Sequence, residues 1–263
     1  MNIDYLIQEV SNLEKKKVED YLLRFYTKSN LNKYEINPLA DKEEIKATRV
    51  MFESKKNLKT RCDLAFEYDP LCLEALLAYM SSVEDIYISY RFESYLKQDN
   101  NFADFSVYQK QKYLKILELY IDFLLDIHNI TTAIKVEKIL ISLSGGASKS
   151  NINHLSFMYS TLENYLDFYM LYLQSDFSTY DYILLLVTLL KNDEELKAKQ
   201  VLMDMEDKIK YTSYLDHLWD LNLKDPEQKE FYDTVEDCYL DIASVPYFFS
   251  WVSNCIKDNQ SRK

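Results

Sequence analysis

Only two of the 263 residues are glycine, and these two, Gly145 and Gly146, are adjacent. Glycine supplies the positive-φ turns of β-hairpins and the close backbone approaches of phosphate-binding loops. A chain that almost lacks glycine is therefore expected to consist of helices joined by short connections. The sequence predicts an all-α fold and argues against most nucleotide-binding folds.

The composition is that of a folded chain with an acidic surface. Hydrophobic residues make up 48% of the sequence and aromatic residues 14%, which is enough for a substantial core. The formal net charge is −12, and the acidic residues are concentrated in the later part, from 193 to 241. Because such a surface repels phosphate backbones and anionic lipids, we expect no nucleic-acid partner and no membrane partner. A basic peptide or protein patch would be attracted.

The cysteines show no spacing typical of a metal site or a redox motif. They are Cys62, Cys72, Cys238 and Cys255. No apolar segment typical of a signal peptide follows Met1, and the longest apolar run, 182–190, is shorter than the about 20 residues that span a bilayer. We therefore expect reduced thiols that fill the core, and a cytoplasmic location.

Apolar residues recur at helical spacing along the whole chain. Asp41 is a predicted N-cap for a helix that runs to about Tyr68, and Asp69-Pro70 ends that helix and starts the next. The later helices are expected at about 71–86, 88–97, 106–127, 131–143, 152–162, 164–173, 180–190, 194–209, 214–221, 226–240 and 246–256.

These helices form pairs that recur at roughly 30 to 40 residues, which is typical of an α-solenoid. No segment has the composition of a linker between domains. We expect a helical extension at 1–40, one continuous helical-repeat domain at 41–257, and a disordered tail at 258–263.

The segment around Asp69-Pro70 resembles the junction between two tetratricopeptide repeats. The small residue Ala65 precedes the proline, and the following helix carries Glu74 and the small Ala78. Small residues let the two helices of a pair approach closely, and the proline separates successive repeats. Later pairs are similar but degenerate, with small second-helix residues at Ala133 and Ala198.

The order of these pieces over residues 61–209 is similar to that of bacterial tetratricopeptide-like proteins related to the suppression-of-tumorigenicity-seven family. The resemblance implies an α-solenoid of degenerate tetratricopeptide-like helix pairs that serves as a scaffold, without identifying a ligand. Gly145 stands where the repeat pattern expects proline. This departure leaves the number and register of the repeats open.

Motifs of catalytic or cofactor chemistry are missing from the sequence. His128, His154 and His217 are far apart, and no HExxH, GxSxG or GxGxxG motif occurs. The stretch 145–150 lacks the spacing of a phosphate-binding loop, so a connector between helices is the favoured interpretation. We expect no metal, no cofactor and no enzymatic activity.

The favoured function is a non-catalytic scaffold or adaptor that binds a peptide or partner protein, including a basic one, on the concave face of the helical stack. The protein is expected to be a monomer or a weak homodimer. The repeat register places eight residues on the concave face: Tyr79, Ser82, Val83, Glu118, Asp122, Asn153, Phe157 and Ser160.

Two other functions stay open at this point. One is a helical-repeat sensor for a small molecule or signalling peptide, and the less favoured one is an all-α enzyme with a site built across helices. The helix at 180–190 is apolar on all sides, which predicts burial between neighbouring helices. The aromatic helix at 246–256 is expected either to cap the stack or to dock a partner.

Overall fold

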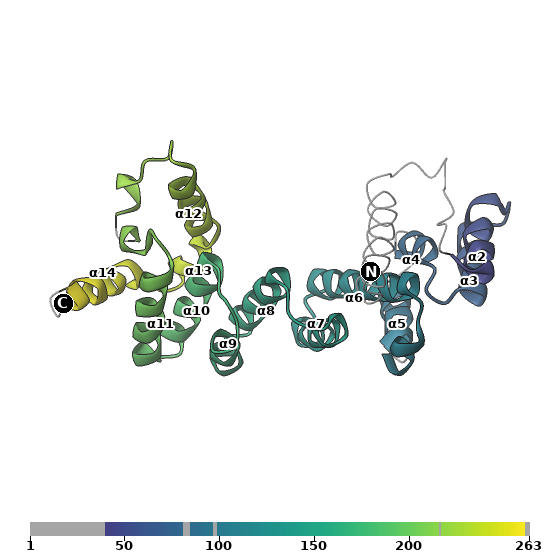
Figure 1. Cartoon of the computed structure of the whole chain (residues 1–263), viewed down its shortest axis with the longest axis horizontal. Helices are drawn as coiled ribbons and strands as arrows, with labels where there is room; N and C mark the ends of the chain where they lie inside the picture. Colours follow the sequence, from purple (N-terminus) through teal and green to yellow (C-terminus); the bar gives the residue numbers. More distant parts are fainter. Residues whose placement is uncertain (1–39, 81–84, 97–98, 216, 261–263) are drawn as a thin grey trace, which may run out of the picture. The chain divides into compact units, whose positions relative to one another are not determined.

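The structure is a computed structural model that describes residues 40–80, 85–96, 99–215 and 217–260. Within these ranges every regular element is a helix, and no strand occurs, which confirms the all-α prediction. The chain divides into two compact units, the first ending at His128 and the second beginning at Asn129 (Figure 1). The expected N-terminal extension lies outside the described residues, except for residue 40.

The first unit is a set of sequential helices in which α2 packs on α3, α3 on α4, and α5 on α6. Its described elements are α2 (Lys42–Glu53), α3 (Leu58–Tyr68), α4 (Leu73–Met80), α5 (Asp85–Leu96), a 3₁₀ segment (Asp99–Asp104) and α6 (Val107–Asp126).

The prediction that Asp41 starts a helix is confirmed, because its carboxylate accepts hydrogen bonds from two backbone N–H groups of the first turn of α2. The prediction of a single helix over 41–68 is wrong, because two helices form there. The chain breaks after Glu53 and begins again at α3, where the side chain of Asn57 accepts a hydrogen bond from the backbone N–H of Thr60. An asparagine that caps a helix in this way starts a new helix and does not continue the old one.

In the second unit the other helices pack around a central one, α10, which contacts α8, α9, α11, α12 and α13. The elements of this unit are α7 (Ile130–Ser144), α8 (Lys149–Thr161), α9 (Tyr165–Tyr172), α10 (Thr179–Lys191), α11 (Glu195–Lys208), two 3₁₀ turns (Thr212–Tyr214 and Leu218–Asp220), α12 (Pro226–Asp237), α13 (Tyr239–Ala243) and α14 (Phe248–Gln260). All residues of α10 from Asp181 to Leu190 are buried, as its apolar sequence predicted.

The prediction of a helix over 214–221 is wrong, since only short 3₁₀ turns form there. The hydroxyl of Thr212 donates to the carbonyl oxygens of Ile209 at 3.1 Å and Met205 at 3.3 Å, which holds the chain against the end of α11. The helix expected over 226–240 is interrupted at Cys238, between α12 and α13.

Two consecutive hairpins of the second unit, α8–α9 and α10–α11, share their local geometry. Ser148 and Ser178 each form a capping box at the start of the first helix. After that helix, the backbone N–H of Asn164 donates to Tyr159 O and that of Glu194 donates to Leu189 O, both at 2.9 Å. The equivalent residues of the second helices, Phe168 and Ala198, are fully buried.

Positive φ angles occur at the ends of several helices and allow the chain to reverse. Besides Gly145 at φ 82, the residues His128, Glu163 and Asp193 have φ between 53 and 58. A residue in the left-handed region lets backbone N–H groups close the last turn of the preceding helix. The glycine pair is thus a helix connector, as expected, and three non-glycine residues reverse the chain in a related way.

The C-terminal helix α14 packs one face against the rest of the second unit. Phe248, Val252 and Ile256 are buried, and the side-chain amide of Asn259 donates to the carboxylate of Glu206 in α11 at 3.0 Å. The aromatic helix therefore covers neighbouring helices, and it extends to Gln260, beyond the start of the tail expected at 258–263.

Replacing Val252 with Asp should destabilise the second unit by about 3 kcal/mol or more, because Val252 is 0% exposed and the new carboxylate would have no partner. Asn254→Asp on the exposed side of the same helix is the matched control and should change stability by less than about 0.5 kcal/mol. Urea unfolding of both variants tests the packing. Equal stability of the two would show that α14 is not held against the unit.

Candidate functional site

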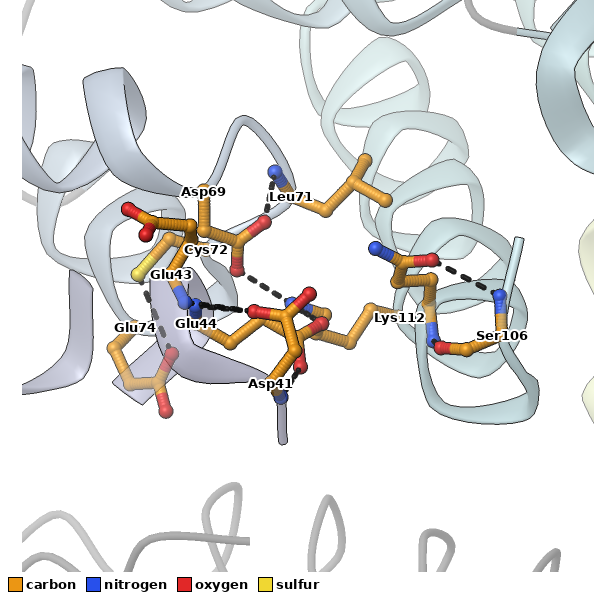
Figure 2. Close-up of polar contacts among 10 residues, drawn as sticks. Asp41, Glu43, Glu44, Asp69, Leu71, Cys72, Glu74, Ser106 and Lys112 are labelled. Atoms are coloured by element: carbon orange, nitrogen blue, oxygen red, sulfur yellow. Dashed lines mark hydrogen bonds and ion pairs between the residues drawn. The ribbon is translucent and has the colours of Figure 1, made fainter. Parts of the chain in front are cut away.

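A buried ion cluster joins three helices of the first unit. Lys112 of α6 is 1% exposed, and its Nζ atom lies 2.5 Å from Oδ2 of Asp69 and 3.1 Å from Oε1 of Glu44. Asp69 is the C-cap of α3, and Glu44 lies in the first turn of α2. Figure 2 shows the lysine side chain reaching from α6 toward these two carboxylates.

The remaining oxygens of both carboxylates bind backbone N–H groups. Oδ1 of Asp69 accepts from Leu71 at 2.9 Å, and Oε2 of Glu44 accepts from Asp41 at 2.7 Å (Figure 2). These bonds fix both acids in the position that meets the ammonium group. Asp69 was identified in the sequence as a helix-ending residue, but nothing near it in the sequence points to Lys112.

Burial determines the acid–base properties of this cluster. It raises the pKa of Glu44, although Lys112 opposes the shift. Burial also opposes the charge of Lys112, yet the carboxylates of Asp69 and Glu44 raise the pKa of its ammonium group above the ordinary value. The pKa of the neighbouring Cys72 thiol is raised well above its usual range by burial. A thiol in this state is a poor nucleophile.

Replacing Lys112 with Met should destabilise the first unit by about 3–5 kcal/mol, because two buried carboxylates would lose their cation. Adding Glu44→Gln and Asp69→Asn should restore part of the loss. Lys115→Met on the same helix is the control, since Lys115 forms an ion pair with Glu118 that is half exposed, and should cost less than about 1 kcal/mol. Urea unfolding measures all three. A loss for Lys112→Met no larger than for the control would contradict the assignment.

A second polar cluster joins three helices of the second unit. The hydroxyls of Tyr182 in α10 and Tyr172 in α9 donate to Oδ2 of Asp204 in α11, at 2.8 and 3.3 Å, and Lys208 lies 3.1 Å from the same oxygen. Burial raises the pKa of Tyr172 to about 12 and also raises that of Tyr182. Burial works against the charge of Asp204, but the hydrogen bonds from Tyr182 and Lys208 lower its pKa.

The raised tyrosine pKa values predict alkaline destabilisation of the second unit. The folded state keeps the Tyr172 proton up to about pH 12, whereas the unfolded chain releases it near the ordinary value of 10.0. The stabilisation is therefore complete below pH 10 and is lost as pH rises toward 12. Tyr172→Phe should lose about 1 kcal/mol at neutral pH and then decline less steeply than the wild type. Urea unfolding between pH 8 and 12 tests this, and parallel curves would contradict it.

Two of the histidines contact neighbouring side chains, and the cysteines lie in the core. His154 Nδ1 lies 3.5 Å from Oε2 of the buried Glu137, and the ring of His217 packs against Trp219 with centroids 5.6 Å apart. All four cysteines are free and buried, which confirms that they fill the core. In the described ranges, no group of three or more His, Cys, Asp or Glu residues could hold a metal ion, and no helix is long and apolar enough to cross a membrane.

The predicted concave-face residues differ in their surroundings. Glu118 and Asp122 are exposed on α6 of the first unit, and Phe157 is 44% exposed on α8 of the second. Tyr79 is half-buried against the ring of Phe66, with centroids 6.0 Å apart. Two further residues of the set, Ser82 and Val83, lie outside the described residues.

Two members of the set make contacts inside the second unit. The hydrogen-bond network orients the half-buried Asn153 amide so that its nitrogen donates to the carboxylate of Asp181 at 3.0 Å. Ser160 is only 7% exposed, and the hydroxyl of Thr188 in α10 donates to its oxygen at 3.1 Å. The expectation that Ser160 faces a binding surface is therefore corrected, because α10 covers it.

A surface that the sequence did not indicate is the outer face of α9, which is formed by Leu166 and Met170 and continued by the C-cap residue Leu173. These side chains are 60%, 51% and 59% exposed, while Phe168 on the opposite side is fully buried. Their spacing places them in one stripe along the helix. Nearly every residue of α9 is apolar or aromatic, so the hydrophobic pattern alone does not distinguish its covered face from its open one.

The flanks of the α9 outer face differ in character. Tyr165 and Tyr169 lie under the ammonium group of Lys197, which is 5.0 and 5.9 Å from their ring centroids. Near the start of the helix, Glu163 and Asp167 are exposed carboxylates, and the stretch 162–176 contains no lysine or arginine. The stripe is thus apolar. Tyrosine rings border it on one flank, and exposed carboxylates lie near its N-terminal end.

Comparison with protein-family models, curated proteins and solved structures finds no match to this chain. The resemblance to tetratricopeptide repeats and to the suppression-of-tumorigenicity-seven family therefore stays a prediction that rests on the residues named above.

Proposed function

We propose that this protein is a non-catalytic interaction module, an α-solenoid of degenerate tetratricopeptide-like helix pairs that binds a partner protein or peptide. The shared capping and turn geometry of α8–α9 and α10–α11 supports the repeat interpretation. Stacked hairpins of this kind leave the outward faces of helices such as α9 as an extended surface.

The observation that carries the proposal is the α9 outer face. Single exposed apolar side chains are common on protein surfaces, but a continuous stripe of Leu166, Met170 and Leu173 keeps three large side chains in water at once. Covering them with a partner removes that apolar area from water and favours association. The stripe therefore favours a binding function for the second unit.

The polar clusters support binding over catalysis. Lys112 is bound to Glu44 and Asp69 inside the first unit, and each of these carboxylates also accepts a backbone N–H group. An active site would instead need reactive groups that converge where a substrate reaches them. Glu118 and Asp122 are exposed on α6, and although Lys115 pairs with Glu118 at 2.6 Å, surface carboxylates of this kind attract basic partners during encounter.

Affinity capture from cells that express the chain, read by quantitative mass spectrometry, tests the proposal. The double variant Leu166→Gln with Met170→Gln should reduce captured partners about tenfold or more, equivalent to about 1.4 kcal/mol. Leu196→Gln with Leu240→Gln is the matched control, because these leucines are 87% and 83% exposed and lie outside the stripe. Glu118→Ala with Asp122→Ala should weaken capture mainly at low salt.

Circular dichroism melts must show that all variants stay folded. Specific capture that is equal for the wild type and the three double variants would contradict the use of these surfaces. A wild-type chain that captures nothing above background would contradict the interaction module itself.

A further inference from the structure

Resting on the proposed function, we propose that the α9 outer face docks a single amphipathic helix of the partner, one whose apolar stripe is bordered by lysine or arginine. The partner is defined by this chemistry: leucine-like side chains on one face and positive charge along an edge.

The shape of the stripe favours a helix as the occupant. Leu166, Met170 and Leu173 follow one side of α9 over about two turns. A ridge of side chains at this spacing fits between the ridges of a second helix. Such a helix contacts the ridge through apolar side chains at positions i, i+3 or i+4, and i+7. The buried Phe168 fixes the other side of α9 against its own unit, so the ridge is presented with the helix already in place.

The charges around the stripe determine the sign of the partner. Glu163 and Asp167 are exposed at its N-terminal end, and no lysine or arginine occurs over 162–176. Two described lysines also lie near this end, since Lys191 lies 3.6 Å from Glu163, and Lys197 lies 2.8 Å from Glu194 and over the rings of Tyr165 and Tyr169. With Asp167, these three carboxylates and two ammonium groups leave one negative charge in excess. A basic edge on the partner would meet these carboxylates, whereas an acidic edge would be repelled.

The same charges argue against a second copy as the occupant. An isologous dimer places the same patch on both sides of the interface. Two α9 outer faces would then bring two copies of Asp167 together, and the stretch 162–176 supplies no lysine or arginine, so the excess negative charge would double. The net charge of −12 adds to that repulsion.

Three fluorescein-labelled model helices, titrated with the full chain and read by fluorescence anisotropy, test the inference. The first has a leucine stripe with lysine edges, the second the same stripe with glutamate edges, and the third lysine edges with the stripe changed to glutamine. The leucine–lysine helix should bind, and the affinity of each of the other two should be lower by about tenfold or more.

Variants of the chain locate the binding. Leu166→Gln with Met170→Gln should weaken binding of the leucine–lysine helix about tenfold. Glu163→Gln with Asp167→Asn should weaken it about threefold to tenfold and reduce its salt dependence. The Asp167 change keeps the backbone N–H that Asn164 caps. The control Leu196→Gln with Leu240→Gln should leave binding unchanged.

Four outcomes would overturn the inference. Equal binding to the wild type and to Leu166→Gln with Met170→Gln would mean that net charge alone attracts the peptide. Tighter binding of the leucine–glutamate helix would reverse the assigned charge. A concentration-dependent dimer in analytical ultracentrifugation, abolished by Leu166→Gln with Met170→Gln, would make a second copy the occupant. If these variants lose cellular partners but no leucine–lysine helix binds, the proposed function stands and this inference fails.

Discussion

The second unit depends on the complete burial of α10. Its side chains are apolar on every side, so a neighbour is needed in each direction, and α8, α9, α11, α12 and α13 supply that cover. Each fully buried leucine or isoleucine contributes about 1.5–3 kcal/mol relative to exposure. Because α9 uses the face with Phe168 for this packing, its opposite face remains for contact outside the unit.

Each unit also has a polar cluster that joins three helices, and the two clusters differ in how exposed their charged groups are. In the first unit the ammonium group of Lys112 is buried between two carboxylates. In the second, the carboxylate of Asp204 accepts hydrogen bonds from two tyrosine hydroxyls and pairs with a lysine close to the surface. Buried ion pairs contribute little net stability, but breaking one is costly, so such clusters favour a particular arrangement of helices. These groups therefore hold helices together in each unit.

Several features followed from the sequence because they depend on neighbouring residues. Asp41 caps α2 and the apolar run of α10 is buried, both as predicted, and α6 begins next to Ser106, where a helix was expected. The scarcity of glycine correctly indicated helices. It did not exclude positive φ angles, which His128, Glu163 and Asp193 adopt at helix ends. Caps and periodicity are local hydrogen-bonding and packing patterns, so the sequence carries them directly.

Tertiary structure decided what depends on contacts across the chain. Lys112 pairs with Asp69 from a distant position in the sequence, and Ser160 is buried because Thr188 of α10 covers it. The exposure of Phe157 and of the α9 outer face has the same origin. Where a helix is apolar all round, or a polar residue lies at a junction, the sequence specifies only the side chain. The neighbouring helices determine whether that side chain is covered or open to a partner.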